Sequence, residues 1–449
     1  MLKTRFAPSP TGFLHIGGLR TALYAFAMAR QGNGKFVLRI EDTDQKREVA
    51  GSAQALQKTL QKFGIVWDEY YIQSQRHQTG IYLKAAQRLV SDGHAFYCQC
   101  PPRNSKETGY SLILRDQCRD KQFTSGAIRL KVPSNRTLTY YDFVHRKEIS
   151  WETESVYDAT LLKSDGFPTY HLAAMVDDLD MHITHILRGH DWLPSTPIHL
   201  LVFEFMGGNR PEIGHLTDIL SSVTGKKLSK RRDSVFCEQF LEDGYLPEAL
   251  LNFVMLLGWA PKDNREVFSL EEFVKNFDMN GFQEANPRFM TEKLNWFNSY
   301  YVRQKTDEQL VDILAPFIPP SELSDAKLKD IIPLVKDRLV KLSEFPKLAG
   351  FFYSLPEPQP QLFTKSALHH LKQASETIAN SPEFKVDSLN LNFKQAIESQ
   401  GFKTGDFFMD LRIAVAGSKF TPPITESILV LGKDESLARI NKAISLLDK

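Results

Sequence analysis

Residues 4–19, which read TRFAPSPTGFLHIGGL, constrain the fold of this chain more than any other segment. A short apolar run leads into a loop that two prolines stiffen and in which three glycines let a ligand approach the backbone. Apolar residues then recur at spacings of three and four from Ile16, which predicts a helix. Because the first N–H groups of a helix lack partners and its dipole is positive there, we expect an anion site beside His15.

This strand, loop and helix predict nucleotide binding without a P-loop, since the pattern G-x-x-x-x-G-K-S/T occurs nowhere in the chain. A β-rich run over residues 36–40 follows, and apolar spacing predicts a helix over residues 50–63. Such alternation favours one half of a doubly wound parallel sheet, whose ligand crevice lies beyond the carboxyl ends of the strands. Arg5, Ser9 and Glu41 fall at or just past such ends.

Residues 4–19 resemble the first signature, the HIGH element, of the class I aminoacyl-tRNA synthetases, in the form carried by glutamyl-tRNA synthetases. The resemblance extends through residues 36–44, which read FVLRIEDTD, and is equally close around Tyr170 and Arg188. Residues 227–231, which read KLSKR, are similar to the family's KMSKS loop. Four motifs in the family's order and spacing form a specific signal, and the resemblance covers nearly the whole chain.

The resemblance implies an enzyme that activates L-glutamate with ATP to glutamyl-adenylate and transfers it to the 3′ end of tRNA(Glu). ATP and Mg²⁺ are the implied cofactors, and tRNA(Glu), L-glutamate and ATP the implied partners. Three alternatives stay open: a glutaminyl-tRNA synthetase, a paralogue that glutamylates a queuosine base of tRNA, and an inactive synthetase-like tRNA-binding protein. The run Ser-Pro-Thr-Gly at residues 9–12 and the long helical stretch after Tyr301 favour the glutamyl type.

The implied architecture is an α/β Rossmann-type catalytic domain with an inserted α+β module that binds the tRNA acceptor end, followed by all-α anticodon-binding domains. Within the catalytic domain, residues 169–178 and 183–187 are expected to contain strands. The expected boundaries are residues 1–70 and 168–222 for the catalytic domain, 71–167 for the insertion, 223–300 for the KMSKS loop and stem-contact domain, and 301–362 and 363–449 for the anticodon-binding domains.

Amino-acid activation requires a carboxylate to attack the α-phosphate of ATP, so the protein must align two anions and stabilise the charge that gathers on the phosphates. The resemblance assigns catalysis to His15, Lys227 and Lys230. A solvated basic loop is the alternative for the lysines. The residues implied to bind ATP are His15, Gly17, Gly18, Trp192 and Lys230.

Glutamate carries two carboxylates and one ammonium, so its pocket should hold two cations and one acidic group. The resemblance supplies Arg5 and Arg188 as carboxylate partners, because bidentate pairing discriminates against the neutral amide of glutamine. It places Glu41 with Ser9 near the ammonium and the Tyr170 hydroxyl on the pocket wall. The full set implied to bind glutamate is Arg5, Ala7, Ser9, Glu41, Tyr170 and Arg188.

The sequence departs from the family at His190, where an acidic residue is common, so the charge role of that position is open. Crowded histidines do not have the spacing of a metal site, and we expect them to be structural. They are His171, His182, His185, His190 and His199.

Three cysteines, Cys98, Cys100 and Cys118, fall where some family members bind structural zinc. Asp120 stands where the family has a histidine ligand, so the fourth ligand is open. Reduced, buried thiols are the alternative. Cys237 is expected to lie in the core.

The chain of 449 residues has a net charge of +1, so a nucleic-acid partner must be held by local patches rather than by overall attraction. No window approaches the roughly eighteen consecutive apolar residues of a membrane span, and the chain opens directly in a strand-like run. Four cysteines in such a length fit a reducing compartment. We therefore expect a cytoplasmic monomer without a signal peptide or membrane contact.

Overall fold

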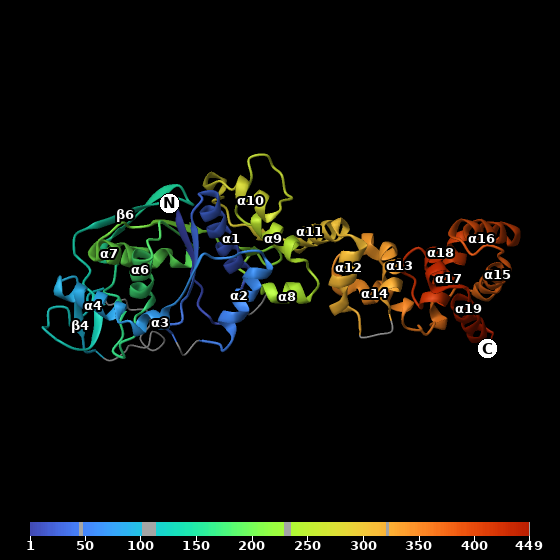
Figure 1. Ribbon diagram of the computed structural model, residues 1–449, viewed down its shortest axis with the longest axis horizontal. Helices are drawn as coiled ribbons and strands as arrows, with labels where there is room; N and C mark the ends of the chain where they lie inside the picture. Colours follow the sequence, from blue (N-terminus) through green and yellow to red (C-terminus); the bar gives the residue numbers. More distant parts are fainter. Residues whose placement is uncertain (45–47, 101–113, 229–234, 320–322, 449) are drawn as a thin grey trace. The chain divides into compact units, whose positions relative to one another are not determined.

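The computed structural model divides into two compact units, each described here by itself (Figure 1). Unit 1 comprises Met1–Phe240 and Leu250–Thr291, and unit 2 comprises Leu241–Ala249 and Glu292–Lys449. The structure describes residues 1–44, 48–100, 114–228, 235–319 and 323–448. The predicted catalytic residue Lys230 lies outside the described residues.

A seven-stranded sheet forms the centre of unit 1, in the order β3-β2-β1-β9-β10-β6-β7. All neighbouring strands run parallel except β6 and β7, which are antiparallel. Phe36, Val37 and Leu38 are completely buried, as expected for a parallel sheet covered on both faces. The α/β fold with a parallel sheet is thus confirmed. The strands are β1 (Lys3–Phe6), β2 (Lys35–Ile40), β3 (Glu69–Ile72), β6 (Thr137–Asp142), β7 (Lys147–Glu152), β9 (His185–Gly189) and β10 (Glu212–Leu216).

Helices cover both faces of this sheet (Figure 1). On one face α4 (Ile81–Ser91), α6 (Tyr170–Asp180) and α7 (Thr196–Met206) share a buried cluster with the sheet. The helix α1 (Ile16–Gln31) packs against β1 and β9. The expectation of a strand within residues 169–178 is wrong, because this segment forms α6. Its residues 172–178 are all buried, so no polar face marked the helical period in the sequence.

The remaining elements of unit 1 surround the main sheet. A three-stranded sheet contains β4 (Ala95–Cys98), β5 (Ala127–Leu130) and β8 (Thr160–Leu162), and a two-stranded one β11 (Leu220–Ser221) and β12 (Arg288–Phe289). The strands β6 and β7 belong to the predicted insertion, residues 71–167, and they extend the central sheet. Further helices are α2 (Ser52–Lys62), α3 (Gln73–Gln78), α8 (Cys237–Glu242), α9 (Pro247–Met255), which continues from unit 2, and α10 (Leu270–Asn276).

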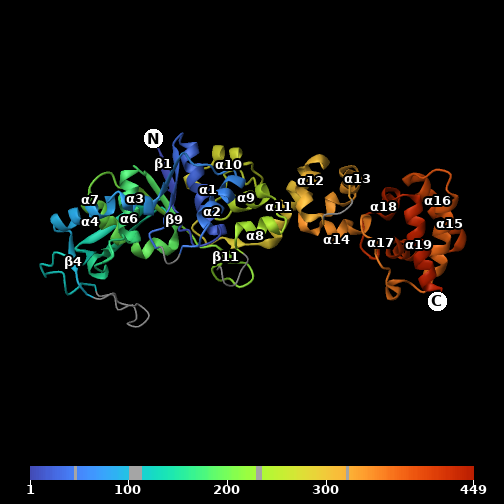
Figure 2. The same ribbon diagram turned by 60° about the horizontal axis from the view of Figure 1, so that its bottom comes forward.

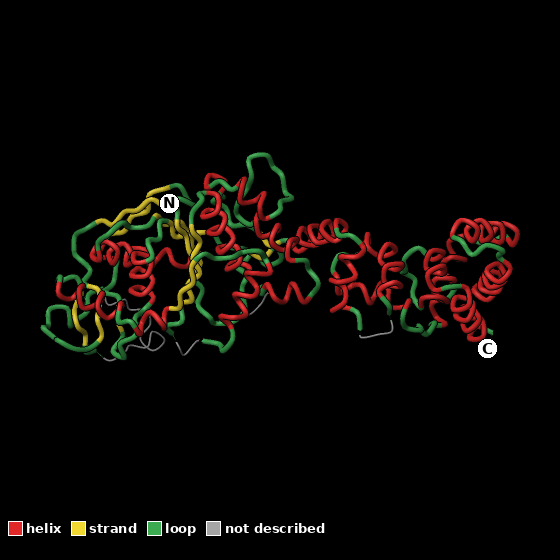
Figure 3. Tube along the Cα trace, in the orientation of Figure 1, coloured by secondary structure: helices red, strands yellow, loops and turns green. Residues whose placement is uncertain are grey.

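Unit 2 contains helices and no strand among its described residues (Figures 2 and 3). The buried Asp410 accepts hydrogen bonds from His370 and from the backbone and hydroxyl of Thr364, at 2.6 to 2.8 Å, and so ties α15 to α17. In the described part of the chain, no helix combines the length and apolar character needed to cross a membrane. The helices from this point on are α11 (Thr291–Gln304), α12 (Asp307–Leu314), α13 (Asp325–Val335), α14 (Phe345–Ala349), α15 (Ala367–Asn380), α16 (Val386–Gln400), α17 (Thr404–Ala416), α18 (Ile424–Leu431) and α19 (Lys433–Leu447).

Candidate active site

Polar residues gather at the carboxyl ends of five adjacent strands of the central sheet. Arg5 is near the end of β1, Glu41 follows β2, and Arg188 is near the end of β9. On the next strand, β10, His215 is in register with Arg188. Asp142 is the last residue of β6, which neighbours β10. These ends share one edge of the sheet, at the point where the strand order reverses, which is where α/β sheets of this kind bind ligands.

The loop after β1 is fixed beside the end of β2. The N–H of Glu41 donates to the carbonyl of Pro8 at 2.9 Å, and the hydroxyl of Ser52 donates to the carbonyl of Pro10 at 2.7 Å. Ala7 and Ser9 belong to this loop. The loop therefore carries both predicted glutamate-binding positions to the neighbourhood of Glu41.

His15 caps the N-terminus of α1. Its Nδ1 accepts a hydrogen bond from the N–H of Gly17 at 2.9 Å, so the neutral ring carries its proton on Nε2. A Cβ at Gly17 would lie only 3.3 Å from that nitrogen, which explains why a glycine suits the position. The imidazole is thereby fixed at the positive end of the helix, where an anion is favoured.

The segment that follows the lysine-rich loop in the chain pairs with the start of α1. Val235 accepts a hydrogen bond from the N–H of Ile16 at 2.9 Å, and Cys237 donates to the carbonyl of Leu14 at 2.8 Å. Residues 229–234, which include Lys230, stand immediately before this pairing in the chain. The segment that follows the second synthetase-like motif in the chain is therefore joined by backbone hydrogen bonds to the first motif, which is far away in sequence.

Lys227, at the base of that loop, binds two carboxylates. Its Nζ lies 2.6 Å from Asp191 and 2.8 Å from Asp218. Although partial burial opposes the charge, these carboxylates raise the pKa of Lys227. His190, where the family commonly has an acidic residue, is exposed. The carboxylate that forms an ion pair with Lys227 comes from the next residue, Asp191.

Tyr170 and Trp192 form a continuous aromatic wall. Their rings stack with centroids 3.9 Å apart and planes 28° apart. Tyr170 begins α6, and its hydroxyl interacts with Arg188, Glu41 and Arg5. The wall thus joins the predicted nucleotide side, marked by Trp192, to the predicted glutamate side.

A buried network of charges lies behind this wall. Asp178 binds Nε of Arg5 at 3.2 Å and Nη1 of Arg39 at 2.6 Å, and Arg39 binds Glu41 at 3.1 Å. Burial raises the pKa of Glu41 to about 7, and the positive charges of Arg39 and Arg5 oppose this rise. Asp178 is a site residue that sequence reasoning missed; the signal was an adjacent pair of acids, Asp177 and Asp178, inside an otherwise apolar run.

Arg188 is held differently. Its guanidinium donates to Nε2 of His215 at 3.0 Å, to Nδ1 of His199 at 2.9 Å and to the hydroxyl of Thr196 at 2.9 Å. Its exposed fraction is 4%, and no carboxylate of the described residues forms an ion pair with it. Burial lowers its pKa. A buried cation without an anionic partner is costly and indicates a site for an anionic ligand.

The cysteine cluster lies elsewhere in unit 1. One ligand atom from each of Cys98, Cys100, Asp116 and Cys118 falls within 4.8 Å of the other three. The Sγ atoms of Cys100 and Cys118 are 3.4 Å apart, and that of Cys98 is 3.6 Å from Oδ1 of Asp116. Three thiols and one carboxylate at such spacing fit a four-coordinate zinc ion. Asp120, by contrast, is 89% exposed and faces Lys131.

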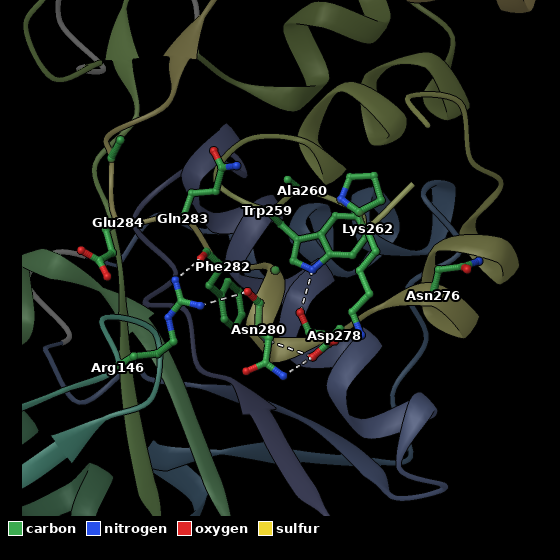
Figure 4. A pocket seen from close by; sticks show the side chains of 13 residues that line it. Arg146, Trp259, Ala260, Lys262, Asn276, Asp278, Asn280, Phe282, Gln283 and Glu284 are labelled. Carbon is green, nitrogen blue, oxygen red and sulfur yellow. Dashed lines mark hydrogen bonds and ion pairs between the residues drawn. The ribbon is translucent and has the colours of Figure 1, made fainter. Parts of the chain in front are cut away.

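A separate cavity of about 550 Å³ lies between the β6–β7 turn and the segment around Trp259 (Figure 4). Arg146 donates to the carbonyls of Asn280 and Phe282 there, and the indole N–H of Trp259 donates to the carbonyl of Asp278. These donors are used within the protein, so they hold the wall together and are not aimed at a ligand.

Comparison with known proteins identifies the domains of this chain. The model of the catalytic domain of class I tRNA synthetases for glutamate and glutamine matches residues 1–296, and that of an anticodon binding domain matches residues 309–444. The glutamate–tRNA ligase of Roseiflexus castenholzii is 37% identical over 99% of this chain and 96% of its own, and that of Finegoldia magna is 37% identical over 99% of both.

Solved structures give the same result. The glutamate–tRNA ligase of Elizabethkingia meningosepticum, in complex with its amino acid, superposes with a TM-score of 0.87 at 32% identity over 99% of both chains. The glutamate–tRNA synthetase of Elizabethkingia anophelis gives a TM-score of 0.85, with the same identity and coverage. The chain therefore belongs to the glutamate–tRNA ligase family of class I aminoacyl-tRNA synthetases.

Proposed function

We propose that this chain activates L-glutamate with ATP to form glutamyl-adenylate and transfers the glutamyl group to the 3′ end of tRNA(Glu). Family membership supports the reaction, and the observation that carries the choice of amino acid is Arg188. This cation is buried beside Arg5 and Tyr170 without a carboxylate partner among the described residues. A substrate carboxylate would neutralise it, whereas the amide of glutamine would not.

In this proposal, some of the predicted site residues bind glutamate and the others bind ATP. Arg5, Arg188 and Tyr170 bind the carboxylates of glutamate, and Glu41 binds its ammonium together with the loop that carries Ala7 and Ser9. On the ATP side, Gly17 and Gly18 present the first turn of α1 to the phosphates, and Trp192 lies beside the nucleotide. His15 and the loop lysines Lys227 and Lys230 stabilise the charge that develops as pyrophosphate leaves. Mg²⁺ enters with ATP, held mostly by phosphate oxygens and water.

An exchange assay with labelled pyrophosphate tests this function. We expect exchange with ATP and L-glutamate but not with L-glutamine, and we expect it to require bound tRNA, as is usual in the family. Aminoacylation of tRNA(Glu) and tRNA(Gln) transcripts then shows which tRNA is charged. A chain that binds tRNA but supports no exchange under these conditions would be an inactive synthetase-like protein.

We further propose that the cysteine cluster binds a structural zinc ion through Cys98, Cys100 and Cys118, with Asp116 as the fourth ligand. The convergence of their ligand atoms supports this set, as does the buried position of Asp116. The thiolates and the carboxylate would bind the metal and so connect residues at the two ends of the gap in the described residues between β4 and β5.

A further inference from the structure

Arg188 differs from the other buried arginines of the site in the chemistry of its acceptors. Arg5 and Arg39 share the carboxylate of Asp178, and Arg39 also binds Glu41. Arg188 interacts with neutral groups in the described structure: the imidazoles of His215 and His199 and the hydroxyls of Thr196 and Tyr170. Each of its three nitrogens has one such acceptor, but its charge is not compensated.

The hydrogen bonds assign the tautomer of His215. A guanidinium only donates, so Nε2 of His215 must accept from Arg188, and its proton must be on Nδ1. Nδ1 lies 2.7 Å from Oδ2 of Asp142, which only accepts. The hydroxyl of Tyr140 also donates to this oxygen, at 2.8 Å. Burial lowers the pKa of His215 to about 4, so the ring is neutral at pH 7.

The tautomer of His199 follows in the same way. Its Nδ1 accepts from Arg188, so its proton is on Nε2, which lies 3.0 Å from Nδ1 of His171 and donates to it. Both rings are neutral: burial lowers the pKa of His171 to about 4 and that of His199 well below its ordinary value. The two histidines therefore offer Arg188 oriented lone pairs without negative charge.

We propose that His215 and His199 are positioning residues that hold Arg188 through neutral ring nitrogens, and thereby keep its full positive charge for the side-chain or α-carboxylate of the bound amino acid. Asp142 and His171 fix the tautomers that make this possible. A carboxylate in place of either histidine would satisfy the same N–H group but would compete with the substrate for the charge. This inference rests on the function proposed above and adds how an acidic substrate is preferred to its amide.

The substitution Asp142→Asn tests the tautomer of His215. Oδ1 of Asp142 accepts from the N–H groups of Val144 and His145 at 3.0 and 3.1 Å, so an asparagine would keep its oxygen there and turn its NH₂ towards His215. His215 would then protonate Nε2, placing a donor against Arg188. We expect kcat/KM for glutamate to fall by about 100-fold or more, since an Asp-to-Asn change behind a histidine imposes the wrong tautomer. A loss below about threefold would overturn the proposal.

A buried pair in unit 2 provides the matched control. His370 and Asp410 also lie 2.7 Å apart, but no arginine donates to His370 in the described structure. Asp410→Asn should lower thermal stability by as much as Asp142→Asn does, yet leave kcat/KM for glutamate unchanged at saturating tRNA. Equal losses of activity in the two variants would show a merely structural effect.

The pair His199→Asn and His199→Asp tests the charge directly. Each variant places an oxygen near the position of Nδ1, neutral in one and anionic in the other. We expect the asparagine variant to keep KM for glutamate within about fivefold, and the aspartate variant to raise it about 30-fold and to reduce the preference over glutamine, because one charge-assisted contact is lost. Equal KM values in the two variants would contradict the proposal.

A spectroscopic measurement separates this inference from the proposed function. In wild-type protein labelled with ¹⁵N-histidine, the ring nitrogens at pH 7 should show His215 protonated on Nδ1 and His199 protonated on Nε2, with assignments from the single variants. His215 protonated on Nε2, or an imidazolium at either position, would overturn the proposed positioning of Arg188 by neutral histidines, whether or not the enzyme is active. If the tautomers are as expected but the chain shows no glutamate-dependent exchange, the proposed function would be overturned and the positioning of Arg188 by His215 and His199 would stand.

Discussion

At the scale of single residues, burial controls the charge of Glu41. Burial raises its pKa to about 7, in spite of the nearby positive charges of Arg39 and Arg5. In its proposed role the carboxylate binds the ammonium of glutamate, and only the ionised form, which predominates above pH 7, can do so. We therefore expect kcat/KM for glutamate to be level above about pH 7 and to fall about tenfold per pH unit below it, since this parameter follows the free enzyme.

The measurement is pyrophosphate exchange across this pH range at saturating ATP and tRNA, with Glu41→Gln as the comparison. A glutamine at position 41 does not titrate, so kcat/KM of the variant should be low and should lack the step at about pH 7. A wild-type profile without that step would remove Glu41 from contact with the ammonium.

At the scale of elements, the segment that follows the lysine-rich loop pairs with the start of α1. Lys227 is held by Asp191 and Asp218, and the segment after Lys230 pairs with the residues around His15. We expect Lys230→Ala to lower kcat of exchange about 10²- to 10³-fold, as for loss of one group that stabilises developing charge. Its Kd for tRNA should stay unchanged in a filter-binding assay. Lys226→Ala, an exposed lysine of the same loop, is the control, and an equal loss of tRNA affinity and exchange in Lys230→Ala would contradict the assigned role.

The cysteine segment gives a second prediction for an element. Purified protein should contain one zinc ion per chain, and Asp116→Asn should weaken metal binding by more than the roughly 10- to 100-fold that loss of an outer partner costs. Asp120→Asn is the matched control, because that carboxylate is exposed and faces Lys131. Chelator competition gives the affinity, and the thiolate bands of the cobalt-substituted protein report the three sulfur ligands. Equal affinities in the two variants would exclude Asp116 as a ligand.

At the scale of the whole molecule, the sequence predicts what local patterns encode. The first loop, its helix and the strand ends carrying Arg5 and Glu41 follow from spacing and turn residues, and the structure has them. The contacts of Asp178 with Arg5 and of the histidines with Arg188 could not be predicted, because strand pairing and helix packing bring these residues together. The prediction of a strand in place of α6 failed for a related reason, since residues 172–178 are all buried and so show no polar face that would give a helical period. Domain boundaries stay a prediction.

The region matched by the anticodon-binding model carries an exposed aromatic side chain. Phe420 is 87% exposed, and Ser418 holds its backbone with hydrogen bonds of 3.1 and 3.2 Å. Arg338 donates to the carbonyl of Thr421 at 2.8 Å. Burial, together with the nearby charge of Arg338, lowers the pKa of Arg412. An exposed ring beside cations suits a single-stranded base, which stacks on the ring while its phosphate meets the cations.

We expect Phe420→Ala to raise KM for tRNA about tenfold in aminoacylation, because stacking on one aromatic side chain contributes about 1–3 kcal/mol. Phe420→Trp should keep the wild-type KM, since the ring face is retained. With tRNA at saturation, exchange should be unchanged, because Phe420 belongs to unit 2 and the residues proposed to bind glutamate belong to unit 1. Leu391→Ala, which removes another exposed apolar side chain of unit 2, is the control. If both alanine variants changed KM equally, general disturbance of the helices would explain the loss, and Phe420 would have no part in holding the tRNA.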